Sequence, residues 1–185
     1  MERKRRKGDN ITMVRKATEK DFSQIASLYD EIHTAEEQGL LQIGWKREIY
    51  PTAETVRAAL DADDLFVIEE DGVIAAAGRI NQIQVDVYAL VPWEYEAEDE
   101  EVMVLHMLAV RPSMSGKGYG SAFERFYEDY TLERGCAVLR IDTNERNTKA
   151  RRLYSRLGYR EAATVPCVFN GIPGVPLVCL EKRIR

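Results

Sequence analysis

The residues of this chain best suited to hold an anion lie at 115–120, which read Ser-Gly-Lys-Gly-Tyr-Gly. This segment follows an uncharged run at 102–110 and precedes a stretch whose apolar residues recur at helical spacing. Alternating glycines let the main chain fold closely around an anion, and the N–H groups at a helix start favour negative charge. Lys117 adds a positive charge nearby. The segment therefore predicts a phosphate site, the alternative being a turn chosen only for its backbone shape.

Two nucleotide motifs can be compared with this loop by spacing. A Walker A loop needs glycine at 111 and Ser or Thr after Lys117, but this chain has Arg111 and Gly118. A dinucleotide fingerprint needs G-x-G-x-x-G, whereas the loop is G-x-G-x-G, although Asp142 stands where a ribose-binding acid would lie. An NAD-type oxidoreductase stays open as an alternative, weakened because the remaining chain ends in a predicted hairpin and not in further βα units.

The elements that position this loop follow from periodicity and from turn residues. Asp71-Gly72 between two β-rich runs indicates a hairpin, and the helix that follows the loop connects two buried strands by a βαβ crossover. These patterns predict an α+β (three-layer α/β) domain with a mixed sheet of about seven strands and helices on both faces. The expected strands are 11–16, 65–70, 73–83, 102–110, 136–143 and the two of a closing hairpin from 159 on. The expected helices run through 28–32, 52–60, 122–130 with a stop at Gly135, and 147–157, and 33–51 is expected to be irregular.

Composition limits the class of protein. A chain of 185 residues with 45% hydrophobic content suits one domain, expected at 11–185, after a basic and disordered leader at 1–10. The 26 Lys and Arg against 31 Asp and Glu make nucleic-acid binding unlikely for the body of the chain, and no apolar run reaches membrane-spanning length. Three cysteines without C-x-x-C spacing and two histidines predict a reduced cytoplasmic protein with no metal site.

The combined pattern resembles the GCN5-related N-acetyltransferase (GNAT) superfamily. The matching pieces are LHMLAV at 105–110, the loop at 111–121, LRIDT at 139–143, and Asn-x-x-Ala-x-x-Leu-Tyr-x-x-x-Gly-Tyr at 147–159. The family loop has Arg or Gln where this chain has Ser115, a departure that removes one side-chain contact but leaves the backbone cradle.

The resemblance implies acetyl-CoA as the acetyl donor, with two central strands splayed apart so that the pantetheine arm lies between them. Leu108, Ala109 and Val110 would offer main-chain groups to the acetyl and pantetheine part, and Asn147 would contact the pantetheine. The loop residues of this expected cofactor site are Ser115, Gly116, Lys117, Gly118, Tyr119, Gly120 and Ser121.

Acetyl transfer to an amine needs a base for the amine, a stabilised oxyanion and a proton for the departing thiolate. Tyr154 matches the family tyrosine that protonates the sulfur; it lies two helical turns after Asn147, on the same face. The alternative is a tyrosine that only packs against the sheet.

Two residues are candidates for the base. His106 precedes Leu108 by two strand positions, which predicts that both side chains share one face, and an ordinary histidine pKa near 6.5 suits proton transfer. The spacing resembles arylalkylamine N-acetyltransferases, where such a histidine acts through water; the alternative is a packed core histidine. Asp142 matches the acidic base of some ribosomal-protein acetylating members, and could equally cap the next loop or brace Asn147.

The acceptor side is less defined. The acidic run at 94–101 could draw in a cationic amine or only be solvated, and Trp45, Tyr50 and Trp93 could line the acceptor site or pin its loops. We expect a cytoplasmic N-acetyltransferase acting on a primary amine of a small molecule or peptide by direct attack in a ternary complex. The other alternative is a catalytically silent acyl-CoA-binding module. The strands within 163–182 offer an edge for a homodimer.

Overall fold

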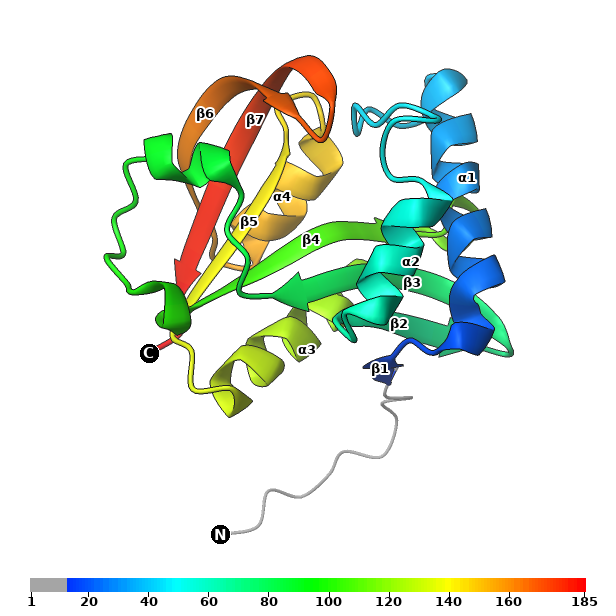
Figure 1. The fold of residues 1–185 in the computed structure, drawn as a ribbon, viewed down its shortest axis with the longest axis horizontal. Coiled ribbons are helices and arrows are strands. Elements are labelled where there is room, and N and C mark those ends of the chain that lie inside the picture. The colour runs from blue at the N-terminus through cyan, green and yellow to red at the C-terminus, as the bar shows by residue number, and fades with distance from the viewer. Residues whose placement is uncertain (1–12) are drawn as a thin grey trace, which may run out of the picture.

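The computed structural model describes residues 13–185, which form one seven-stranded mixed sheet with four α-helices (Figure 1). The predicted fold class is confirmed. The expected leader at 1–10 and the first residues of the expected strand at 11–16 lie outside the described residues. The strands are β1 (Val14–Lys16), β2 (Leu65–Glu70), β3 (Val73–Asn81), β4 (Val102–Val110), β5 (Val138–Asn144), β6 (Arg160–Phe169) and β7 (Ile172–Arg183). The helices are α1 (Phe22–Glu37), α2 (Ala53–Asp61), α3 (Tyr119–Glu133) and α4 (Thr148–Arg156).

The sheet order is β1-β2-β3-β4-β5-β7-β6, and every neighbouring pair is antiparallel except β4 and β5. The parallel pair is the one that the α3 crossover predicts, because strands joined by a crossover helix run in the same direction. Apolar residues of α1 and α2 pack on one face of the sheet, and those of α3 and α4 pack on the other. The helices thus cover both faces, as Figure 1 shows for α2 and α3.

The two central strands separate after a short ladder. The β4–β5 pairing covers Val102–Leu105 against Val138–Ile141, while β4 continues to Val110 beside β3 and β5 continues to Asn144 beside β7. Main-chain groups of β4 beyond Leu105 therefore face a gap and not a neighbouring strand on the β5 side. A gap of this kind needs other hydrogen-bond partners, because strand N–H and C=O groups are costly to leave unpaired away from water.

Two elements differ in length from the prediction. Helix α1 runs to Glu37, past the expected end at residue 32, because the buried residues His33 and Ala35 continue its apolar face. Strand β3 ends at Asn81, and not at residue 83, because the Asn81 side chain accepts a hydrogen bond from the Ile83 N–H at 2.9 Å. Such an Asx turn replaces the strand ladder with a local bond.

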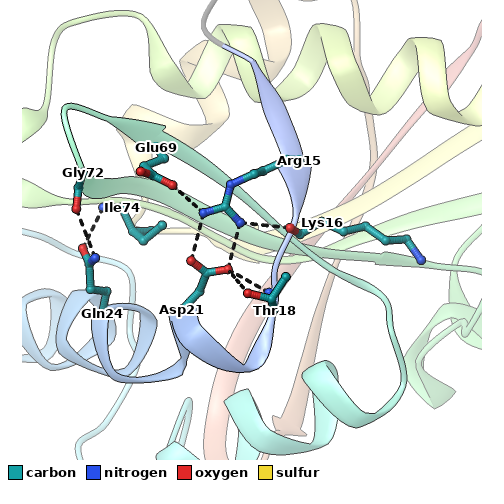
Figure 2. A network of polar contacts seen from close by, with 8 residues as sticks. All are labelled: Arg15, Lys16, Thr18, Asp21, Gln24, Glu69, Gly72 and Ile74. Carbon is teal, nitrogen blue, oxygen red and sulfur yellow. Dashed lines mark hydrogen bonds and ion pairs between the residues drawn. The ribbon is translucent and has the colours of Figure 1, made fainter.

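An ion-pair network fixes α1 against the sheet edge. Figure 2 shows Arg15 of β1 donating to Asp21 at 2.8 and 2.9 Å and to Glu69 of β2 at 2.5 Å. Hydrogen bonds from Arg15 lower the pKa of Asp21 to about 2. Gln24 in the first turn of α1 accepts from the N–H of Ile74, which follows the β2–β3 turn, at 3.0 Å. These contacts set the position of α1, which carries part of the site described below.

A carboxyl group lies fully buried in the core beneath α3. Glu124 is 0% exposed; its Oε2 accepts from the Tyr159 hydroxyl at 2.8 Å, and its Oε1 has no partner in the described part of the chain. Burial raises the pKa of Glu124 to about 8. The side chain is therefore held protonated at neutral pH in the folded protein.

Replacing this carboxyl is expected to stabilise the protein at alkaline pH. The unfolded chain releases the Glu124 proton near the ordinary value of 4.5, but the folded protein keeps it until about pH 8, so stability falls as pH rises across that window. The loss reaches at most about 4 to 5 kcal/mol. Glu124→Gln cannot ionise, so its advantage in melting temperature over the unsubstituted protein should widen from pH 4.5 to pH 8. Asp129→Asn, which changes an exposed carboxylate of the same helix, is the control, and parallel melting profiles for Glu124→Gln and the unsubstituted protein would contradict the expectation.

Candidate functional site

Two cavities meet where β4 and β5 separate. One, of about 480 Å³, lies between the glycine loop, the start of α4 and the segment 39–43. The other, of about 230 Å³, lies beside the segment 43–50, the separated ends of β4 and β5, and the β6–β7 hairpin. We call them the loop cavity and the inner cavity. The residues that line both are Ile43, Leu108, Asn147, Ala150 and Tyr154.

The glycine loop forms one wall of the loop cavity. Gly116 and Gly118 adopt left-handed backbone conformations, with φ of 85° and 87°, that favour glycine. Gly120 allows α3 to pack closely on α4, since an added Cβ would lie 3.1 Å from the Leu153 side chain. The predicted cofactor-site residues that line this cavity are Leu108, Ala109, Val110, Ser115, Gly116, Gly118, Tyr119, Gly120, Ser121 and Asn147.

Lys117 is the one predicted loop residue that does not line the cavity. Its Nζ lies 3.4 Å from Glu70 of β2, which also accepts a hydrogen bond from the Tyr119 hydroxyl. Other cations line the cavity instead: Arg146, Lys149 and Arg156, which sequence reasoning missed. The helical pattern of 147–157 placed Lys149 and Arg156 on an element next to the loop, but spacing alone did not show which of its charges face the loop.

Asn147 begins α4 and uses both polar atoms of its side chain. Its Oδ1 accepts from the Ala150 N–H at 3.2 Å, which caps the helix, and its Nδ2 donates to Thr143 at 3.1 Å. It lies on both cavities, but its side chain first of all fixes where α4 starts. Because Tyr154 lies two turns further on the same helix, this cap also sets the position of the tyrosine.

Tyr154 lies at the junction of the two cavities. Its side chain is 5% exposed, and its ring packs edge-on against Tyr159 with ring centroids 5.6 Å apart. Burial, with the negative charges of Glu124 and Asp142, raises the pKa of Tyr154 well above its usual value. The hydroxyl thus keeps its proton across the physiological range and can donate it.

The prediction that His106 and Leu108 share a face is wrong. Met107 has a positive φ of 50°, and the β3–β4 register shifts at this point, which marks a β-bulge. Before the bulge, Leu105 packs in the α3 cluster; after it, Leu108 packs in that cluster too. His106 pairs instead with Arg79 on the opposite face. The buried Tyr29 of α1 donates to the Met107 carbonyl at 2.9 Å and so holds the bulge.

His106 lines the inner cavity in a fixed protonation state. Its Nε2 lies 3.0 Å from Asn81 Oδ1, which also accepts from a main-chain N–H, while Asn81 Nδ2 donates to Asp64 at 2.8 Å. Because Asn81 Oδ1 can only accept, Nε2 carries the proton. Burial, then the charge of Arg79, lowers the pKa of His106 to about 4. Its pKa therefore differs from the ordinary value near 6.5 used in the prediction.

Asp142 lines the inner cavity near the end of β5. The Tyr88 hydroxyl donates to its Oδ2 at 2.8 Å. Burial raises the pKa of Asp142 to about 6, and the Tyr88 bond opposes that rise. Neither of the structural roles considered for Asp142 is seen, since Asn147 is braced by Thr143 and the next loop is closed by Asn144, whose Oδ1 accepts from the Arg146 N–H at 3.0 Å. Asp142 is thus a carboxylate that titrates near neutral pH inside a cavity.

Aromatic residues of the segment 43–50 form an outer wall of the inner cavity. Trp45 and Tyr50 line this cavity, and their rings pack edge-on with centroids 6.0 Å apart. Trp93 does not line it; it packs against Tyr88 and beneath Arg140 and so pins its loop. No residue of the acidic run 94–101 lines either cavity, so an acidic funnel at this site is not what the described residues show.

Glu36 of α1 holds the segment between the cavities. Its carboxylate accepts from the N–H groups of Ile43 and Gly44 at 2.7 and 2.9 Å. Gly44 has a φ of 84° and approaches Asn144 so closely that an added Cβ would lie 2.4 Å from the Asn144 amide nitrogen. Sequence reasoning left this segment as irregular and missed Glu36, Arg79 and Asn81, since their positions depend on contacts across the fold.

Residues 13–185 contain neither a membrane-spanning helix nor a cluster of metal-binding side chains. No helix in that range combines the length and apolarity needed to cross a membrane. Within the same range, no group of three or more His, Cys, Asp or Glu side chains is arranged to hold a metal ion.

Solved structures with the same fold come from several bacteria. A GNAT family acetyltransferase of Streptococcus agalactiae 2603 has a TM-score of 0.75 at 22% identity, covering 94% of this chain and 95% of that one. The Brucella melitensis ribosomal-protein-alanine N-acetyltransferase has 0.70 at 18%, covering 93% and 99%. The Salmonella typhimurium protein yncA, solved with its cofactor acetyl-CoA, has 0.67 at 18%, covering 94% of each chain. These likenesses show the fold.

The family of the chain follows from a match to a family model. Among curated proteins no relative matches this chain. The model of the acetyltransferase (GNAT) family matches residues 23–159, which contain the glycine loop, the bulged strand and Tyr154. The chain therefore belongs to the GNAT acetyltransferase family.

Proposed function

We propose that the protein is an acetyl-CoA-dependent N-acetyltransferase that acts on a primary amine of a small molecule or peptide by direct attack in a ternary complex. The observation that carries this proposal is the meeting of two cavities at Tyr154. One cavity is lined by cations and by a glycine loop, and the other by a carboxylate and aromatic side chains. A donor and an acceptor bound in these cavities would meet beside a proton donor.

The lining of the loop cavity suits the charge and the amide groups of coenzyme A. Its cations and the left-handed glycines suit phosphate groups, and the main-chain groups of Leu108, Ala109 and Val110 beyond the β4–β5 ladder suit the amides of a pantetheine arm. Acetyl-CoA supplies an activated acetyl group as a thioester. The chain supplies orientation, because the arm that fills the gap would point toward the inner cavity.

Tyr154 is the proposed general acid. A departing thiolate needs a proton in the transition state, and a tyrosine whose pKa lies well above its usual value remains protonated to give one. Its place on both cavities puts the hydroxyl where donor and acceptor would meet.

Asp142 is favoured over His106 as the base that removes the amine proton through water. General-base catalysis is most efficient when the pKa of the base lies near the working pH. The pKa of Asp142 is raised to about 6, whereas that of His106 is lowered to about 4 and its Nε2 is occupied by Asn81. His106 is then a neutral residue of the cavity wall.

The inner cavity favours an acceptor of modest size. A volume of about 230 Å³ bordered by Trp45, Tyr50 and Phe169 holds a small amine or the terminal residue of a peptide, with apolar and aromatic contacts around it. A cytoplasmic location is part of the proposal, supported by three cysteines that are all free thiols.

The decisive experiment follows thiol release from acetyl-CoA in the presence of a panel of primary amines. The proposal expects release that depends on both protein and amine, together with acetylated amine in the product. Binding of coenzyme A without release for any amine would favour the silent acyl-CoA-binding module. Thermal protection by NAD but not by coenzyme A would favour the oxidoreductase.

A further inference from the structure

We infer that Lys149 of α4, and not Lys117 of the glycine loop, is the side-chain cation that binds the diphosphate of coenzyme A. This inference rests on the proposed function. Lys149 lies outside the loop, on α4, about thirty positions after Lys117 in the chain. The contacts of the two lysines differ, and the assignment follows from that difference.

Lys117 is directed away from the loop cavity. It is exposed, it does not line the cavity, and its Nζ lies 3.4 Å from Glu70 of β2. The Glu70 carboxylate also accepts from the Tyr119 hydroxyl, and both bonds lower its pKa. To reach a phosphate in the cavity, the Lys117 ammonium would have to leave a carboxylate, which reduces what it can contribute.

Lys149 is directed toward the loop. Its Nζ donates to Ser115 Oγ at 2.5 Å, and both residues line the loop cavity. This contact brings the ammonium to the first residue of the segment whose glycines turn their backbone around the cavity. One of the three N–H groups of the ammonium is used by Ser115, so two remain for phosphate oxygens.

The loop cavity that Lys149 lines is rich in cations. Arg146 and Arg156 line the same cavity, and of the part of the chain that the structure describes no Asp or Glu lines it. Lys149 is also the second residue of α4, where the helix dipole disfavours a positive charge. A bound polyanion would remove both penalties, because phosphate oxygens accept charge-assisted hydrogen bonds and neutralise the three cations.

Ser115 gives the contact its physical reason. Its side chain is short and uncharged, so this loop position brings no cation of its own. The Lys149 side chain reaches it from α4 and supplies the charge that the position lacks. A cation beside Ser115 is thus provided by α4 and not by the loop.

The test measures affinity for coenzyme A by calorimetry in the unsubstituted protein and in Lys149→Gln. We expect the dissociation constant to rise by about tenfold or more in the variant, since a charge-assisted hydrogen bond is lost. Lys117→Gln, and Arg152→Gln, which removes an exposed cation of α4 that does not line the loop cavity, are the controls and should change affinity by less than about twofold. The loss of a cation from the first turn of α4 does not weaken that helix.

Two shorter ligands and a rescue variant locate the contact. Dephospho-CoA keeps the diphosphate and should be weakened by Lys149→Gln as much as coenzyme A; pantetheine has no diphosphate and should be unaffected. Ser115→Arg in the Lys149→Gln background returns a cation to the loop and should restore most of the affinity. The inference is overturned if Lys149→Gln binds coenzyme A normally, if Lys117→Gln is equally weakened, or if dephospho-CoA is unaffected. Absence of coenzyme A binding by the unsubstituted protein overturns the proposed function as well.

Discussion

Tyr154→Phe is expected to lower kcat by about 100-fold to 1,000-fold while leaving the affinity for coenzyme A within about threefold of the unsubstituted protein. The hydroxyl is the only group removed, and the ring continues to pack against Tyr159 at 5.6 Å between centroids. Loss of a proton donor slows departure of the thiolate but does not change the contacts that hold the donor. Steady-state thiol release with saturating amine and calorimetry with coenzyme A measure the two quantities.

The control for this substitution is Tyr130→Phe. Tyr130 of α3 packs against Phe66 of β2 and Phe126 of α3 and lines neither cavity, so loss of its hydroxyl should leave both kcat and affinity unchanged. An unchanged kcat in Tyr154→Phe would remove the general-acid assignment. A large loss of coenzyme A affinity in that variant would instead assign the hydroxyl to binding.

Asp142→Asn is expected to remove the low-pH limb of kcat/KM and to lower its plateau by about 100-fold. As a base, Asp142 acts only when deprotonated, so activity should rise with pH through its pKa of about 6. The amide cannot take a proton, so the break in the profile near pH 6 should disappear, and the pH dependence that remains should be that of the acceptor amine alone. The amine of the acceptor titrates at higher pH and gives a separate limb, which both proteins share.

Two further variants separate Asp142 from its neighbours. Tyr88→Phe removes the hydrogen bond that lowers the pKa of Asp142, so the limb should move to higher pH. His106→Gln should leave the limb in place, because His106 stays neutral above about pH 4. If His106→Gln flattens the limb and Asp142→Asn keeps it, the histidine is the base and the assignment made here is reversed.

Most of the fold follows from local patterns in the sequence. The Asp71-Gly72 turn, the uncharged run that became β4 and the glycine at 135 that ends α3 each predict an element that the structure confirms. Even the start of α4 is local, since Asn147 caps it through its own side chain. These signals involve residues close together in the chain, so their geometry is set by turn and cap chemistry.

The site depends on contacts that no local pattern shows. The bulge at Met107 shifts the alternation of side chains in the part of β4 that follows it, where Met107 has a positive φ and its carbonyl accepts from Tyr29 of α1. Strict alternation therefore misplaced His106 relative to Leu108. The low pKa of His106 likewise comes from burial and from Arg79 on the neighbouring strand, so the type of residue alone gives the wrong titration range.

The charged residues that face the loop cavity are likewise set by contacts across the fold and not by local sequence. Lys117 is adjacent to the glycines in sequence, yet its partner Glu70 lies at the end of β2, while Lys149 reaches the loop from α4. Which of two lysines faces a cavity depends on the direction of side chains across three elements. Sequence spacing predicts that a cation is near, and only the folded arrangement identifies it.

The separation of β4 from β5 after Leu105 also affects the tendency of the protein to aggregate. An unpaired strand edge is a template on which another chain can add a strand, which is a common route to aggregation. Here that edge lies between the segment 39–43 and the start of α4, whose side chains wall the opening on both sides. A second strand would have to lie along the edge of β4 between these walls, whose side chains stand in its way. The walls that shape the opening for a ligand therefore also shield the unpaired edge of β4 from neighbouring molecules.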